Sequence, residues 1–200
     1  VSGDISAAAF WLVASAVHPD SSVQLRNVGI NPTRSEVIDI LKAMGAKIRI
    51  ENRHIEGGEP VADLLIESSE LTGVEISGTQ IPIVQDEVPI LALAACFAKG
   101  TTIIRDAAEL RVKESDRLFT TAKELSRLGA HIRETDDGLV IEGTGYLNGG
   151  SCRSYGDHRL AMTLGVAGLV AKDAVVISGS EAVDVSYPGF WDDMDMLTTN

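Results

Sequence analysis

Three apolar segments, each introduced by an aspartate, recur along this chain of 200 residues. They are GDISAAAFWLVASAV (3–17), QDEVPILALAACFA (85–98) and GDHRLAMTLGVAGLV (156–170). Each would be apolar on nearly every face as a helix, and a helix of that kind must be buried on all sides. A short strand pattern follows each segment. The chain therefore predicts a repeated supersecondary unit built around three buried helices.

A second pair of related segments, ILKAMGAKIRI (40–50) and ELSRLGAHIRE (124–134), gives the rest of the unit. Each ends an amphipathic helix pattern, over 34–44 and 117–128, and precedes a strand pattern. Gly45 and Gly129 stand where a left-handed residue usually ends a helix. Each full unit therefore reads helix, strand, helix, strand, strand.

These units predict an α/β fold with a pseudo-threefold arrangement, in which the central helices lie inside and the sheets and amphipathic helices surround them. We expect residues 1–200 to form one such domain, with its third unit cut short after YPGFWDDMDML (187–197). A doubly wound sheet is the alternative. It explains the all-apolar helices less well, because each of its helices shows one face to water.

Composition limits the partners of this chain. A net charge of −12 argues against nucleic acid and against an anionic membrane surface. We expect neither a signal peptide nor a membrane span. The sequence shows no CxxC, GxGxxG or Walker A pattern, so neither a metal nor a nucleotide cofactor is indicated. Cys96 and Cys152 are far apart, and Cys96 lies in an apolar run, which fits a buried thiol in a reducing cytoplasm.

The aspartates of the three apolar segments suggest an anion site. Asp4, Asp86 and Asp157 each suit the N-cap of the helix that follows. If the three helices run parallel, their N-termini meet at one face, which then offers partial positive charge and free N–H donors. Such a face can bind a phosphate or a carboxylate.

Two cationic motifs, RVKESDR (111–117) and GDHR (156–159), strengthen this expectation. Arg117, His158 and Arg159 fall in first helical turns, where a cation opposes the helix dipole. Lys113 lies close by in the chain. A bound anion would reverse the sign of this interaction, whereas the alternative is a solvated turn with surface cations.

Two carboxylates are candidates for proton transfer. Glu114 lies between two cations and could exchange a proton once a ligand neutralises them. Asp86 begins the second apolar segment beside Glu87, and either caps the helix or serves as a general base at the same face.

These motifs together resemble the 5-enolpyruvylshikimate-3-phosphate synthase family of enolpyruvyl transferases. The resemblance rests on LRVKESDR after AKGTTIIRD, on GDHRLAM, on the Gly-Ala helix ends and on VSYPGFW. It implies two similar domains of three βαβαββ units with the active site between them. It also implies transfer of the enolpyruvyl group of phosphoenolpyruvate to the 5-hydroxyl of shikimate 3-phosphate, with release of phosphate, in the shikimate pathway and without a metal or organic cofactor. Glyphosate occupies the phosphoenolpyruvate site in this family.

The resemblance assigns roles to the candidate residues. Asp86 matches an aspartate that contacts the shikimate hydroxyls and is a candidate base for the attacking 5-hydroxyl. Lys113 matches a lysine near both substrates, and Glu114 matches a glutamate that handles the proton at the methylene carbon. The arginines that hold the carboxylate and phosphate of phosphoenolpyruvate match Arg117 and Arg159.

His158 matches a neighbouring histidine of the same site. One departure is Val185, where some family members carry a lysine. The chain looks like the phosphoenolpyruvate-side domain alone, so we expect it to be one piece of a larger enzyme whose second domain is its partner. Two other readings stay open: the related transferase that acts on UDP-N-acetylglucosamine, and a non-catalytic binding module built from repeats.

Overall fold

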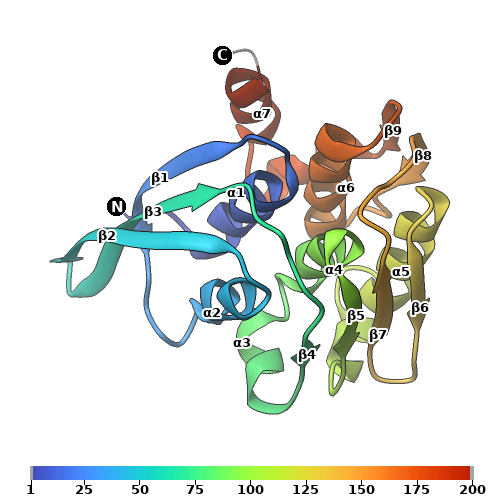
Figure 1. Cartoon of the computed structure of the whole chain (residues 1–200), viewed down its shortest axis with the longest axis horizontal. Helices are drawn as coiled ribbons and strands as arrows, with labels where there is room; N and C mark the ends of the chain where they lie inside the picture. The colour runs from blue at the N-terminus through green and yellow to red at the C-terminus, as the bar shows by residue number, and fades with distance from the viewer. Residues whose placement is uncertain (1, 199–200) are drawn as a thin grey trace.

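Three packed helices occupy the centre of the computed structural model, which describes residues 2–198. They are α1 (Ile5–Val17), α4 (Val88–Phe97) and α6 (His158–Val170), and each contacts the other two (Figure 1). Their apolar side chains are buried around almost the whole circumference of each helix, as with Leu12, Leu91 and Leu164. The expected pseudo-threefold α/β arrangement is confirmed.

The first two units have the same strand order after their central helices. The first contains β1 (Ser22–Gly29), α2 (Glu36–Ala43), β2 (Lys47–Glu56) and β3 (Glu59–Glu67), with antiparallel order β1-β3-β2. The second contains β4 (Glu75–Ile76), β5 (Gly100–Ile104), α5 (Arg117–Arg127), β6 (His131–Glu134) and β7 (Leu139–Gly143), in the order β4-β5-β7-β6. Because β4 precedes α4 and runs parallel to β5, the second unit is a complete βαβαββ.

The third unit contains β8 (Gly150–Arg153), which precedes α6 in the sequence, and β9 (Val175–Ser178), which follows it. The two strands pair in parallel. The chain then passes through a 3-10 segment, Ser180–Val185, to α7 (Phe190–Thr198). Phe190 stacks on Trp11 at 5.0 Å and meets Phe10 edge to face at 6.1 Å, so α7 packs on α1. It also approaches α6 closely, since a side chain at Gly165 would meet Trp191 at 2.9 Å.

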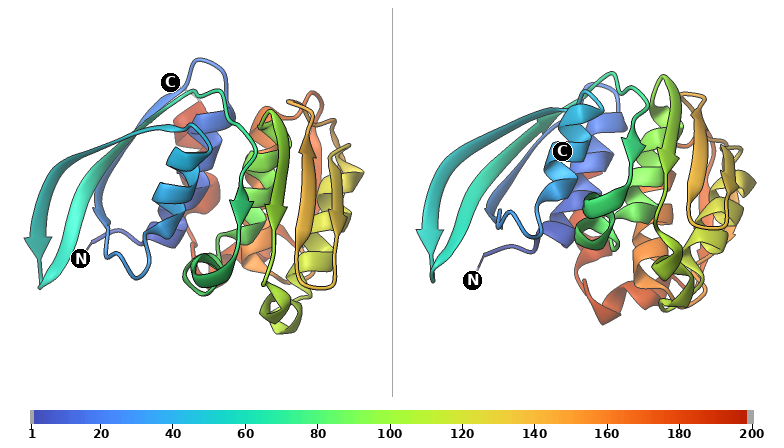
Figure 2. Two further views of the ribbon diagram at one scale, coloured as in Figure 1. Left: turned by 60° about the horizontal axis from the view of Figure 1, so that its bottom comes forward. Right: turned by 90° about the horizontal axis from the view of Figure 1, so that it is seen from below.

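The sheets flank the helical centre on different sides. In both views of Figure 2 the sheet β1-β3-β2 lies on one side of the central helices and the sheet containing β5 and β7 lies on the other. Short helical segments, α3 (Ile81–Val84) with Gly78–Gln80 and a 3-10 turn at Ala108–Val112, lead into α4 and α5. They carry the chain to the end of the helical centre where the N-termini of α4 and α6 lie.

The helix ends predicted from the sequence are confirmed at four positions and wrong at one. Asp4 and Asp157 cap α1 and α6 through their side chains. Gly45 and Gly129 are left-handed, with φ of 100° and 89°, and the residue after each donates back to the carbonyl five positions earlier. The expectation that Asp86 caps a helix is wrong. Glu87 holds that position in α4 without a side-chain cap, and Asp86 bonds to Arg117 instead.

The helices of the described residues are too short or too polar to span a membrane singly. Within residues 2–198 no single helix is both long and apolar enough to cross a bilayer. One pair, Gly78–Val84 with Val88–Phe97, meets the criterion only jointly and across a bend of 112°.

Candidate active site

The guanidinium of Arg117 binds three carboxylates from three parts of the chain. Its Nε lies 2.9 Å from Asp157, its Nη1 2.8 Å from Asp86 and its Nη2 2.7 Å from Glu114. Asp116 caps α5 by accepting from the backbone N–H of Phe119, which places Arg117 at the first position of the helix, as the sequence predicted. Arg117 is only 2% exposed, so this is a buried ionic network rather than a solvated turn.

Asp157 links the two motifs. Its side chain caps α6, accepts from Arg117 and accepts the hydroxyl of Ser115 at 3.0 Å, and it is fully buried. The motif at 111–117 and the motif at 156–159 are therefore joined through one carboxylate. The sequence predicted Asp157 only as a cap and gave no sign of this second role.

Asp86 lies between two arginines. Its Oδ1 accepts from Arg117, and its Oδ2 lies 3.7 Å from Nη2 of Arg159. Burial alone would raise the pKa of Asp86, but the hydrogen bond from Arg117 and the charges of Arg159 and Lys113 hold it below the usual value. Asp86 is therefore an ionised carboxylate and a weak base in this arrangement.

Lys113 and Glu114 occupy the outer side of this cluster. Glu114 is about half exposed, with its side chain at 48%, although it bonds to the buried Arg117. The only ion pair that the described residues give Lys113 is a loose one of 3.9 Å to the exposed Glu109. Lys113 therefore has a charge available for a ligand, and Glu114 is the network carboxylate that can leave with least disturbance.

His158 lies beside the cluster as the first residue of α6. Burial, reinforced by the charge of Arg159, lowers the pKa of His158 below its usual value. At neutral pH the imidazole is therefore mostly uncharged. His158 offers a hydrogen-bonding group, so the expectation of a cation at this position needs correction.

Arg111, the remaining cation of the first motif, has a structural role. It bonds to the carboxylates of Asp116 and Glu134 and to the backbone carbonyls of Thr135 and Asp136. These contacts tie the segment before α5 to the loop between β6 and β7. The loop that carries Lys113 and Glu114 is therefore held at its base.

The backbone before α6 is fixed by Glu124 of α5. This carboxylate is fully buried and accepts from the backbone N–H of Arg153 at 3.0 Å and from the hydroxyl of Tyr155 at 2.8 Å. Tyr155 and Gly156 both have positive φ, 58° and 74°, so the turn is tight. Glu124 thus holds the turn that places Asp157, His158 and Arg159.

Removing this support is expected to destabilise the fold. Glu124→Ala leaves the Arg153 N–H and the Tyr155 hydroxyl without their acceptor, at an expected cost of about 2 to 3 kcal/mol in the free energy of unfolding. Tyr155→Phe removes one of the two bonds and is expected to cost about 1 kcal/mol. Urea unfolding of both variants measures this, and an alanine variant as stable as the phenylalanine variant would contradict the assignment.

A second group of polar residues connects α1 and α4 beneath the cluster. Arg34 donates to the hydroxyl of Ser6 at 3.0 Å, and the hydroxyl of Ser6 acts on the carboxyl of Glu87, whose pKa it lowers. Glu87 is 2% exposed. Burial raises the pKa of Glu87, and Asp86 adds to the effect. Sequence reasoning noted Glu87 only as the neighbour of Asp86, and it found no role for Ser6 or Arg34.

The raised pKa of Glu87 gives a pH-dependent prediction. Below about pH 4.5 the side chain is neutral in both the folded and the unfolded chain. Above that pH the unfolded chain ionises first, so folding of the native protein loses about 1.4 kcal/mol per pH unit until the folded carboxyl also ionises. Glu87→Gln is free of this loss. The free energy of unfolding of Glu87→Gln minus that of the native protein, both from urea unfolding, should rise between pH 4.5 and pH 7. A free-energy difference that does not change with pH would contradict the prediction.

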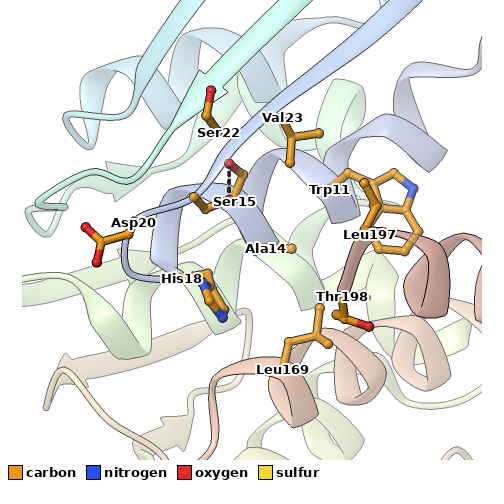
Figure 3. A pocket seen from close by; sticks show the side chains of 11 residues that line it. Trp11, Ala14, Ser15, His18, Asp20, Ser22, Val23, Leu169, Leu197 and Thr198 are labelled. Carbon is orange, nitrogen blue, oxygen red and sulfur yellow. Dashed lines mark hydrogen bonds between the residues drawn. The ribbon is translucent and has the colours of Figure 1, made fainter. Parts of the chain in front are cut away.

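Two hollows of the described surface lie away from the centre of this cluster. One of about 480 Å³ lies at the opposite ends of α1 and α6, where Trp11, His18, Leu169 and Leu197 line it (Figure 3). Its described lining includes no Arg or Lys, so it offers little to an anion. Another of about 780 Å³ reaches the turn before α6 at Gly156 and also contains Val185.

The candidate residues thus fall into two sets. Asp86, Glu114, Arg117 and Arg159 are connected by direct contacts at the end of the helices where the sequence led us to expect them, although the ion pairs themselves were not predicted. Within residues 2–198, Lys113 and His158 adjoin this network without a side-chain hydrogen bond to it, but the charge of Lys113 acts on Asp86. No grouping of three or more His, Cys, Asp or Glu suited to a metal ion occurs within residues 2–198.

Comparison with known proteins gives a consistent result. Residues 1–194 match the sequence model of the family described as EPSP synthase (3-phosphoshikimate 1-carboxyvinyltransferase). Proteins named 3-phosphoshikimate 1-carboxyvinyltransferase from Desulforudis audaxviator and Gloeobacter violaceus are 57% and 58% identical over 190 and 192 residues, or 95% and 96% of this chain. The structure of EPSP synthase from Acinetobacter baumannii superposes with a TM-score of 0.95 at 43% identity over 98% of the chain.

The chain spans less than half the length of these proteins, namely 44% of the two relatives and 46% of the solved structure. Within that span both the sequence and the fold agree. The chain belongs to the EPSP synthase (3-phosphoshikimate 1-carboxyvinyltransferase) family.

Proposed function

We propose that residues 1–200 form the phosphoenolpyruvate-side domain of an enzyme that transfers the enolpyruvyl group of phosphoenolpyruvate to the 5-hydroxyl of shikimate 3-phosphate. The observation that carries the proposal is the joining of the two cationic motifs around Arg117 and Asp86, at the end where α4 and α6 begin. Family membership supplies the reaction. The length of the relatives supports a second domain that forms the opposite wall of the site. The cytoplasmic location expected from the sequence stays a prediction.

Binding of the donor uses the cations on the outer side of the cluster. Arg159 has only a long contact with Asp86, and Lys113 only a loose one with Glu109. Both side chains can therefore bind a phosphate or carboxylate without breaking a strong existing ion pair. The starts of α4 and α6 add a favourable field for an anion.

Arg117 needs an exchange of partners before it can hold a substrate carboxylate, because its three nitrogens are already engaged. Glu114 is the most exposed of its three carboxylates. The carboxylate of phosphoenolpyruvate therefore takes the place of Glu114 on Arg117. This exchange releases Glu114 beside the bound donor, where a proton can pass to the methylene carbon.

The reaction then needs proton transfers at two sites and no external oxidant or reductant. Glu114, which takes up a proton from water once it has left Arg117, protonates the methylene carbon, positive charge develops at C2, and the 5-hydroxyl attacks C2 while Asp86 takes its proton. The tetrahedral intermediate then loses phosphate, which leaves with the proton from Asp86, and the methyl carbon returns its proton to Glu114. Because the donor draws Arg159 away from Asp86, its arrival should raise the pKa of Asp86 and make it a better base. Fixed cations hold both anions in place.

Binding of the donor by this chain tests the proposal. Titration of phosphoenolpyruvate with the 200-residue chain, followed by phosphorus NMR, is expected to broaden and shift the ligand signal with weak affinity. Arg159→Ala should abolish the effect, and Arg105→Ala, an exposed arginine at the end of β5, should leave it intact. A flat titration with the native chain up to high ligand concentration would refute the proposed site.

A further inference from the structure

Few buried side-chain polar atoms in residues 2–198 are without a hydrogen-bond partner. They are Oε1 of Gln85, Oε1 of Glu87, Oγ1 of Thr102, Oγ1 of Thr121 and Nε of Arg159. Native proteins rarely leave such atoms unpaired, so each calls for an explanation. Two of them are complementary: the oxygen of Glu87 accepts a hydrogen bond, and the Nε–H of Arg159 donates one.

Both atoms belong to the starts of neighbouring central helices. Glu87 holds the N-cap position of α4, and Arg159 is the second residue of α6, which packs against α4. The charge of Arg159 acts on the carboxyl of Glu87. The structure therefore has an open acceptor and an open donor at one end of the helical centre.

The hydroxyl of Ser6 in α1 acts on the carboxyl of Glu87. Ser6 accepts a hydrogen bond from Arg34, so its own hydroxyl hydrogen is free to point to Glu87. Ser6 is fully buried in the first turn of α1. Glu87 thus has a polar neighbour in α1, while its Oε1 has no hydrogen-bond partner within the described residues.

Arg159 is held only loosely. Its side chain is 11% exposed, and its only ion pair within the described residues is the 3.7 Å contact of Nη2 with Asp86. A substrate anion approaches the exposed part of the guanidinium and takes its Nη donors. The buried Nε–H then needs an acceptor if the plane of the guanidinium is to stay fixed.

We propose that Glu87 is a positioning residue for Arg159, whose Nε donates to Oε1 of Glu87 when an anionic substrate engages the Nη atoms. The proposal rests on the proposed function, since it takes phosphoenolpyruvate as the anion. Ser6, which accepts a hydrogen bond from Arg34, acts on the carboxyl of Glu87 from α1. Glu87 does not touch substrate and acts through Arg159 alone.

The surroundings of Glu87 are compatible with this role. Asp86, Arg159 and Arg34 are the charged groups that act on it, and burial raises its pKa. Its Oε1 can accept a hydrogen bond from Nε whether the carboxyl is neutral or ionised.

Three variants of the 200-residue chain test the role. We expect Glu87→Ala to weaken phosphoenolpyruvate binding roughly tenfold in the phosphorus NMR titration, since Nε loses its acceptor. Glu87→Gln keeps a carbonyl oxygen and should bind within about threefold of the native chain. Thr102→Val, which removes another buried unpaired oxygen on β5, is the matched control and should bind like the native chain. Glu87→Ala binding as tightly as the native chain would overturn the proposal.

The Nε–Hε signal of Arg159 in nitrogen-15 NMR gives a direct readout. It should shift on addition of phosphoenolpyruvate in the native chain and in Glu87→Gln, and should not shift in the same way in Glu87→Ala. If Glu87→Ala does not fold, the native chain and Glu87→Gln still test the proposal. An Nε–Hε signal of Arg159 that does not shift when phosphoenolpyruvate is added to these two chains would contradict it. A native chain that binds no phosphoenolpyruvate overturns both this inference and the proposed function, whereas binding that depends on Arg159 but not on Glu87 overturns this inference alone.

Discussion

Replacing Arg117 by leucine is expected to lower the free energy of unfolding by about 3 to 5 kcal/mol. The variant leaves Asp157 fully buried without its main cation and brings the negative charges of Asp86 and Glu114 together. Removal of one partner from a buried ionic network costs far more than the network contributes as a whole, because the remaining charges stay desolvated. Equilibrium unfolding in urea at neutral pH measures the loss.

Two controls separate this effect from a general cost of losing an arginine. Arg117→Lys keeps the charge but cannot reach three carboxylates in one plane, so an intermediate loss is expected. Arg105→Leu removes an exposed arginine whose ion pair with Glu75 has a distance of 3.7 Å, and its effect should stay below about 1 kcal/mol. Equal losses for Arg117→Leu and Arg105→Leu would show that the buried network does not hold the site together.

Glu114→Gln is expected to change binding and turnover in opposite directions. The amide has no negative charge to compete for Arg117, so phosphoenolpyruvate should bind several-fold more tightly to the variant chain, by the order of magnitude of one exposed charge interaction. The amide also cannot carry the proton to the methylene carbon. In an enzyme completed with the other half of the protein, turnover should fall by about 10² to 10⁴-fold.

This pairing of results distinguishes the exchange on Arg117 from simple damage to the site. A damaged site would lose affinity and turnover together. Glu142→Gln, an exposed carboxylate on β7, is the matched control for the loss of one negative charge and should change neither quantity appreciably. Weaker binding by Glu114→Gln would contradict the exchange, even if turnover fell as expected.

Much of the fold could be predicted because the relevant signals are local. An apolar segment after an aspartate predicts a buried helix wherever it occurs, and three repeats of it predict three central helices. Gly45 and Gly129 ended their helices as expected, since a left-handed residue requires little beyond its own conformational freedom. The cap at Asp116 is local in the same way, because its side chain accepts from the backbone N–H of Phe119, three residues further along the chain.

The features that sequence reasoning missed depend on residues far apart in the chain. Arg117 meets Asp86 and Asp157 across 31 and 40 positions, so nothing near it in the sequence shows that its charge is already balanced. The expected cap at Asp86 was wrong for the same reason, because an arginine from α5 competes for the carboxylate. Arg34, Ser6 and Glu87 likewise come from three segments: Arg34 donates to Ser6, and the packing of α1 against α4 brings Ser6 to act on Glu87.

The central claim is that this chain is one wall of an enolpyruvyl transferase site, and phosphate release tests it most directly. The remaining sequence of the Desulforudis audaxviator relative, which is 57% identical over the shared region, can supply the other half in trans. Phosphate released from phosphoenolpyruvate in the presence of shikimate 3-phosphate should require both pieces and should disappear with Glu114→Ala. No release from two pieces that are each shown to be folded and to associate would contradict the claim.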